Sequence, residues 1–262
     1  MAAADRPHVA LFVTCLVDAM RPPIGFAAIA LLEAAGCTVS VPAAQTCCGQ
    51  PARNSGDRAG AADLAAHTIA LLEPFDAVVV PSGSCAATII QYPELFDAGS
   101  AWHARATALA GRTHELLAYL ADHRKFTPAG IALPATATYH DSCSGLRELG
   151  VAAQPRALLG AVAGLALLPL EGAETCCGFG GTFCVKYPAI SNAIVDEKSR
   201  AIEATGAGLL LGGDLGCLMN MAGKLHRRGS PVRAYHAAEI LAGMAGPGIG
   251  SGMAGPAIGE PA

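Results

Sequence analysis

The hydrophobic positions of this chain fall into short runs of branched apolar residues, most of them separated by longer helical patterns. Short apolar runs of this kind are typical of strands buried on both faces of a sheet. We expect strands over residues 9–14, 38–41, 77–81, 136–140, 165–168, 208–211 and 231–235. The longer stretches predict helices over residues 25–35, 57–72, 102–123, 154–163 and 189–205. Because strands and helices alternate, the pattern predicts an α/β protein with parallel sheets.

The composition agrees with buried elements and excludes some function classes. Hydrophobic residues make up 52% of the 262 residues and charged residues 15%, with a mean hydropathy of +0.41. No run approaches the ~20 strongly apolar residues of a membrane span, and the start of the chain carries Asp5, Arg6 and His8 without a signal-peptide core. We therefore expect a cytoplasmic protein. The formal net charge of −4 argues against a nucleic-acid partner.

Eight of the ten cysteines form two sets with matching spacing, and a glycine, Gly49 or Gly178, follows each adjacent pair. The two sets are Cys15, Cys47, Cys48, Cys85 and Cys143, Cys176, Cys177, Cys217. The offsets between partners are 128, 129, 129 and 132 residues, which indicates an internal duplication. We expect two similar Rossmann-like halves, residues 1–125 and 126–242, followed by a flexible, dispensable Gly/Ala/Pro-rich tail over residues 243–262.

Most of these cysteines follow the carboxyl end of a predicted strand, where open parallel sheets bind their ligands. Four thiolates per half suit an iron-sulfur cluster, and we expect one 4Fe-4S cluster in each half. Gly49 and Gly178 let backbone N–H groups approach the sulfur atoms. Zinc in one half remains an alternative, as does burial of cysteines as small apolar residues. Cys37 and Cys184 lie outside the repeat and are not assigned as ligands.

Three segments of the second half carry a family resemblance: residues 139–150 (YHDSCSGLRELG), 176–183 (CCGFGGTF) and 214–220 (DLGCLMN). Together with the first Cys-Cys-Gly motif and residues 81–85 (PSGSC), they resemble the cysteine-rich CCG-domain family, which includes heterodisulfide reductase B subunits. The resemblance to its lactate-utilization members implies an iron-sulfur electron-transfer subunit of a cytoplasmic complex that oxidises L-lactate to pyruvate. It also implies two partners, a ferredoxin-like iron-sulfur subunit and a third small subunit.

Two positions depart from the heterodisulfide reductase pattern, which ends in C-x2-C and supplies five cysteines per noncubane cluster. Ser82 and Asp214 occupy the first of those positions here. Four-cysteine sites therefore fit better, with Ser82 and Asp214 as alternative oxygen ligands or as residues that support the ligands.

His140 and Asp141 precede Cys143 at a predicted strand end. An imidazole there could move a proton during electron transfer, so these two residues are candidate catalytic groups. A histidine that only caps the strand end is the alternative.

A function of a different class also fits the cysteines. The chain has no dinucleotide-binding G-x-G-x-x-G motif after its first strand, so we expect it to act on lactate only with its partners. The alternative is a zinc-based or thiol-based module that scaffolds a complex or senses redox state.

Overall fold

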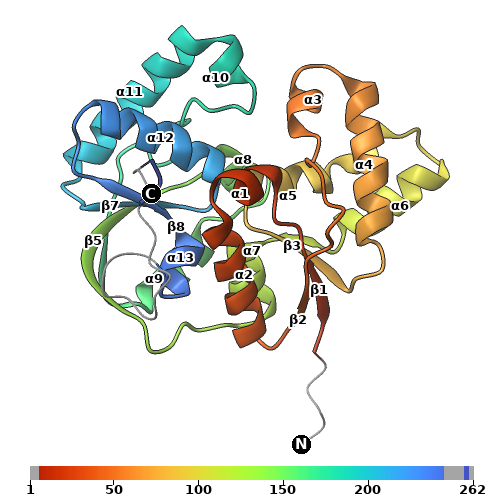
Figure 1. Cartoon of the computed structure of the whole chain (residues 1–262), viewed down its shortest axis with the longest axis horizontal. Helices are drawn as coiled ribbons and strands as arrows, with labels where there is room; N and C mark the ends of the chain where they lie inside the picture. Colours follow the sequence, from red (N-terminus) through yellow and green to blue (C-terminus); the bar gives the residue numbers. More distant parts are fainter. Residues whose placement is uncertain (1–5, 245–256, 260–262) are drawn as a thin grey trace, which may run out of the picture.

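The computed structural model describes residues 6–244 and 257–259 and contains two four-stranded, all-parallel sheets. The strand orders are β2-β1-β3-β4 and β6-β5-β7-β8, so the second sheet repeats the first strand for strand. In Figure 1 the first half (red to yellow) and the second half (green to blue) lie side by side. The prediction of an α/β fold with two similar halves is confirmed.

The strands of each half end at the same edge, where the helices that follow them begin. The strands are β1 (His8–Leu11), β2 (Thr38–Ser40), β3 (Ala77–Val80), β4 (Thr113–Glu115), β5 (Ala132–His140), β6 (Ala163–Leu168), β7 (Leu209–Gly212) and β8 (Arg233–His236). The central strand β3 shows why these runs form strands, because all four of its residues are buried. Strands covered on both faces need apolar side chains throughout.

Thirteen α-helices, one 3-10 turn (η1) and one π turn (η2) are described within these residues. The helices of the first half are α1 (Cys15–Met20), α2 (Pro22–Ala34), α3 (Gln50–Asn54), α4 (Arg58–Leu72), α5 (Gly83–Ile90), α6 (Ala101–Ala110) and α7 (Leu116–Ala118), with η1 (Tyr92–Leu95) and η2 (Tyr119–His123). Those of the second half are α8 (Cys143–Arg147), α9 (Ala153–Gly160), α10 (Phe183–Lys186), α11 (Pro188–Ala204), α12 (Leu215–Arg227) and α13 (Ala237–Leu241). No described helix is both long enough and apolar enough to cross a membrane.

Several short elements of the structure were not predicted, among them the helices α1, α5 and α8. The helix expected over 102–123 ends at Ala110 and is followed by the short strand β4, which pairs with β3. The helix prediction was wrong after Ala110, because a three-residue strand is too short to show a periodic pattern of its own. Helix α12 was not predicted, although it carries Cys217.

The two halves share one hydrophobic core, the first half has a second core of its own, and Val17 and Ile24 of the first half also enter the core of the second. The shared core contains Leu11 and Leu32 from the first half and Tyr139 and Tyr235 from the second. Helix α2 packs against α13, as their adjacent positions in Figure 1 show. The halves are therefore joined by apolar packing and not only by the connecting chain.

Most of the tail expected to be flexible lies outside the described residues. Ala257 and Ile258 are described and buried, at 1% and 7% exposure, and Ile258 forms an antiparallel bridge with Ala234 of β8. At these residues the tail differs from the expectation, because Ala257 packs in the shared core and Ile258 in the core of the second half.

Candidate metal centres

A cysteine lies in the first turn of the helix that follows each central strand. Cys15 and Cys143 begin α1 and α8, and Cys85 and Cys217 lie in the first turns of α5 and α12. The unpaired N–H groups of a helix N-terminus favour negative charge, so these positions stabilise a thiolate. The strand-to-helix turns of the fold thus place two cysteines of each half at the positive end of a helix dipole.

The adjacent cysteines complete a group of four in each half. In the first half Cys15 and Cys48 both donate hydrogen bonds to Cys47, and the Sγ of Cys48 donates to that of Cys85 at 3.3 Å. The second half repeats the order of contacts, which runs through Cys143, Cys176, Cys177 and Cys217. The eight repeated cysteines therefore gather into two groups of four, as their spacing predicts.

The first group of thiols lines a cavity of about 170 Å³ at the boundary between the halves. Cys15, Cys47, Cys48 and Cys85 form one side, and Phe179 and Leu215 of the second half contribute to the other. Gly216 leaves room for the Phe179 ring, because an added Cβ would lie 2.5 Å from it. A cavity lined by all four sulfur atoms is the space that a cluster held by them would need, so these residues fit the group.

The ionisation of the thiols also points to a cation. The hydrogen bond that Cys15 donates to Cys47, together with burial and the charges of Cys47 and Cys85, raises the pKa of Cys15. The same bond, with the one donated by Cys48, lowers the pKa of Cys47 to about 2. One thiolate therefore forms easily, but four thiolates in contact repel one another unless positive charge lies among them. Bound iron or zinc would supply that charge.

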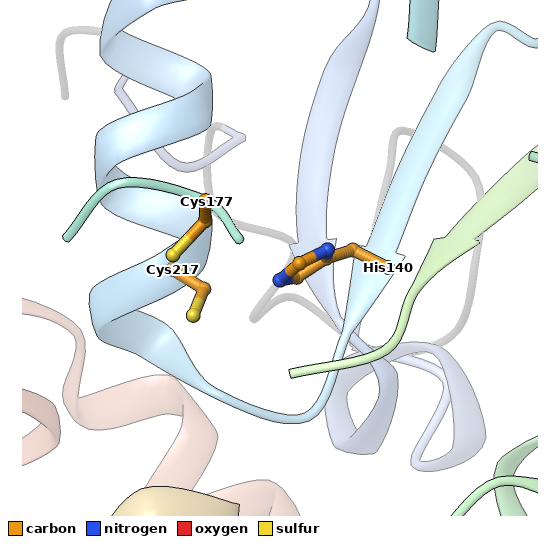
Figure 2. A group of neighbouring side chains, drawn as sticks. All are labelled: His140, Cys177 and Cys217. Carbon is orange, nitrogen blue, oxygen red and sulfur yellow. The ribbon is translucent and has the colours of Figure 1, made fainter. Parts of the chain in front are cut away.

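The second group differs by including a histidine on its buried side. Donor atoms of His140, Cys177 and Cys217 all lie within 4.8 Å of one another. Figure 2 shows the imidazole, from the end of β5, pointing toward the two sulfur atoms. A group of soft sulfur and imidazole donors suits a transition metal.

The glycine after each adjacent cysteine pair adopts a left-handed conformation. Gly49 has φ +85° and Gly178 has φ +80°. The N–H of Gly178 donates to the Sγ of Cys176 at 3.3 Å, and Gly49 donates likewise to Cys47. Both glycines thus direct a backbone N–H at a sulfur atom, the arrangement expected from the sequence.

A polar side chain fixes the carbonyl of the second cysteine in each pair. The hydroxyl of Tyr92 donates to the carbonyl of Cys48 at 2.8 Å, and the amide of Asn220 donates to that of Cys177 at the same distance. These two residues hold the loops in place and were not identified from the sequence, because neither lies close to a cysteine pair along the chain.

Ser82 and Asp214 lie together at the boundary between the halves. The Ser82 hydroxyl donates to Oδ2 of Asp214 at 3.0 Å, and the N–H of Ser84 donates to the same oxygen at 3.1 Å. Both side chains line the cavity of the first group. Asp214 therefore contacts the first half, although the sequence places it beside Cys217 of the second.

Asp141 and Lys198 are charged residues buried near the second group. Arg156 donates to both carboxylate oxygens of Asp141, at 2.8 and 2.7 Å, so we interpret Asp141 as an anchor for α9. The ammonium of Lys198 donates to the carbonyls of Gly172 and Ala173. Burial lowers the pKa of Lys198 to about 8, while nearby Asp141 and thiols oppose this shift. Sequence analysis missed Lys198, because its helical pattern alone does not distinguish a buried lysine from an exposed one.

The two remaining cysteines are apart from this pattern. Cys37 is buried in the shared core, where burial raises its pKa. Cys184 is half-buried, and its thiol donates to the carbonyl of Gly181 at 3.6 Å.

Comparison with known proteins agrees with the duplication. The family model described as "Cysteine-rich domain", CCG, matches twice, over residues 9–90 and 137–222. The chain belongs to this family. Each copy of the cysteine-rich domain contains one complete group of four cysteines.

The family includes curated relatives that are similar along almost the whole chain. The Exiguobacterium sp. protein named "Lactate utilization protein A" is 48% identical over 237 residues, which is 90% of this chain and 97% of the relative. Proteins of the same name from Anoxybacillus flavithermus and Geobacillus kaustophilus are 47% identical over 234 residues and 48% identical over 233 residues. Each of these alignments covers 89% of this chain and 98% of the relative.

Proposed function

We propose that this chain is the iron-sulfur electron-transfer subunit of a cytoplasmic complex that oxidises L-lactate to pyruvate. The observation that carries the proposal is the pair of four-thiol groups, joined by the same order of contacts at equivalent strand ends. The name shared by the relatives supports lactate utilization as the process.

Each group of thiols would hold one cluster of the 4Fe-4S type. When bound, such a cluster supplies one-electron transfer. Cys15, Cys85, Cys143 and Cys217 lie at helix N-termini, whose dipoles favour the negative charge of a cluster held there. The N–H groups of Gly49 and Gly178 donate to sulfur and so help to set the potential.

The cavities around the first group support electron transfer rather than lactate binding. Cys15 and Cys47 line both the cavity of about 170 Å³ and a second one of about 240 Å³. The residues that line these two cavities include Asp18 and Asp214 but no lysine, arginine or histidine. A carboxylate substrate is usually bound by such cationic donors. We therefore propose that lactate is bound on a partner subunit.

Exposed features near the second group offer a surface for such partners. Cys176 is exposed, and Val185 of α10, Tyr187 between the helices and Ile190 of α11 are exposed by 79%, 54% and 54%. Exposed apolar residues that are close together favour a protein contact. We propose that the ferredoxin-like iron-sulfur subunit and the third small subunit assemble with this chain, with one of them covering this surface.

The test is the metal content and spectrum of anaerobically purified protein. We expect about eight irons per chain and a broad absorbance of iron-sulfur charge transfer. Cys47→Ser should lose iron from the first group only, and Cys176→Ser from the second only, because each group is built from one half. Adding the partner subunits should allow lactate to reduce the centres. Colourless protein with one or two zinc ions would contradict the proposal and support a structural zinc module instead.

A further inference from the structure

His140 is buried beside the second group of thiols, with the carbonyl of Ala173 as its nearby polar neighbour. Its side chain is 1% exposed, and neither ring nitrogen has a partner of normal geometry among the described residues. The nearby carbonyl of Ala173 already accepts from the ammonium of Lys198 at 2.8 Å. Leaving a buried polar group unpaired is destabilising, so such a group in a native protein calls for an explanation.

The ring lies where a metal bound by the second group would be. It points toward the sulfur atoms of Cys177 and Cys217, and one donor atom from each of the three residues lies within 4.8 Å of the others (Figure 2). A neutral imidazole carries the lone pair that a metal ligand needs.

The first half has no such donor at the equivalent position. Phe12 lies three residues before Cys15, and His140 lies three residues before Cys143. Phe12 directly follows β1, and His140 is the last residue of the equivalent strand β5. Phe12 is fully buried in the core of the first half. The duplicated site thus has a hydrocarbon ring in one half and a nitrogen donor in the other.

We propose that the imidazole of His140 is a metal ligand of the second centre, whose donors are then thiolates and one nitrogen, whereas the first centre is held by thiolates alone. The inference rests on the proposed function only in requiring iron at the second group. Asp214, at the position of the missing cysteine, has an oxygen bound by Ser82 and Ser84 of the first half. His140 therefore supplies the additional donor from a different strand.

The proposed ligand makes the two centres unequal. An imidazole is neutral and a weaker donor than a thiolate, and its presence on iron raises the reduction potential. The ammonium of Lys198, buried near Cys177, acts in the same direction. We expect the second centre to accept an electron more readily than the first.

The test measures nitrogen bound to iron in the full chain, purified anaerobically after growth on ¹⁵N-histidine. Pulsed electron paramagnetic resonance of the reduced protein should show a nitrogen coupling of the size that direct ligation gives. The coupling should be absent in His140→Phe, which copies Phe12 of the first half. It should be unchanged in His226→Gln, which alters an exposed histidine on the same helix as Cys217.

A second variant covers the case in which His140→Phe fails to fold or loses iron. His140→Cys keeps a metal donor at this position, so it should retain iron at the second centre, lack the nitrogen coupling and lower the potential. Iron at the second centre without the nitrogen coupling in the wild-type chain would overturn the ligand proposal and leave the proposed function intact. Absence of iron from the second group would instead refute the proposed function of that half.

Discussion

Gly49 and Gly178 share a left-handed conformation but differ in the space around them. An added Cβ at Gly178 would lie 2.8 Å from the carbonyl oxygen of Ser191, whereas at Gly49 its closest contact would be an ordinary 3.6 Å. The hydroxyl of Ser191 already donates to the carbonyl of Gly178 at 2.8 Å, so α11 lies close against this loop.

We expect Gly178→Ala to cost more than the ~1–2 kcal/mol of left-handed strain, because the loop must also move away from α11. Gly49→Ala is the matched control and should lose only the strain energy. Urea unfolding and iron content of the two variants test this. Equal losses would show that the backbone conformation alone requires the glycines.

Glu115 is a buried carboxyl group with one oxygen unpartnered. Oε2 accepts from the N–H of Ala118 at 2.8 Å, while Oε1 has no partner among the described residues. Burial raises the pKa of Glu115 to about 7 from 4.5, with a further contribution from the charge of Asp214. The folded protein therefore binds a proton here that the unfolded chain releases at lower pH.

The raised pKa predicts a loss of stability as pH rises. Protonation of Glu115 contributes about 3 kcal/mol to the free energy of unfolding. This contribution is fully present below pH 4.5 and is lost as pH rises through about 7. Glu115→Gln should therefore be more stable than the wild-type chain at pH 8 and similar to it at pH 4.5. Unfolding free energies at both pH values measure the difference. A constant difference between the two proteins would contradict the assignment.

At the scale of elements, the repeated unit is a parallel strand whose end leads into a helix with a cysteine in its first turn. Caps define these helices: Thr14, Ser82 and Ser142 each accept a backbone N–H with the side chain. Asp214 is the exception, because its carboxylate accepts from Ser82 and Ser84 of the other half. Asp214, at this capping position, therefore links the two halves.

The short segment near the end of the chain belongs to the second half. Ala257 and Ile258 are buried, and Ile258 pairs with Ala234 at the edge of the sheet. Ile258→Ala should lower the free energy of unfolding by about 2 kcal/mol or more, because it leaves a cavity. Truncation after Gly259 is the control and should leave it unchanged. Thermal or urea unfolding of both variants checks this, and an unaffected Ile258→Ala would restore the view of a dispensable tail.

At the scale of the molecule, the two halves are held by the shared core and by a buried ion pair. Arg21, between α1 and α2, donates to Glu239 of α13, with side-chain exposures of 11% and 1%. Glu239 also accepts from the N–H of His236 and so completes the start of α13. An ion pair therefore joins the first half directly to helix α13 of the second.

Breaking this pair should destabilise the whole protein. We expect Arg21→Met to cost about 3–5 kcal/mol, because it leaves a buried carboxylate without its cation. Arg105→Met breaks the more exposed pair with Glu73 and should cost at most about 1 kcal/mol. Circular dichroism and intrinsic fluorescence during urea unfolding should give a single shared transition in the wild-type protein. Two separate transitions would show that the halves fold independently.

The sequence by itself determined the duplication, the α/β class and the grouping of the eight cysteines. These features follow from periodicity and spacing, which are local properties: the apolar run of β3 predicts its burial, and equal offsets predict equivalent strand ends. Strand β4 was not predicted, because three residues are too few to show a periodic pattern of apolar positions. Helix α12 was not predicted, because the start of this segment was interpreted only as the motif that contains Cys217.

Only the tertiary structure decided which half of the protein each polar residue of the sites contacts. It placed Asp214 against Ser82, the ring of Phe179 over Gly216 at the first cavity, and the imidazole of His140 beside Cys177 and Cys217. These contacts join residues that are far apart along the chain, and they depend on how the halves and their helices pack. Neither periodicity nor motif spacing carries that information, since both describe neighbours in sequence and not neighbours in space.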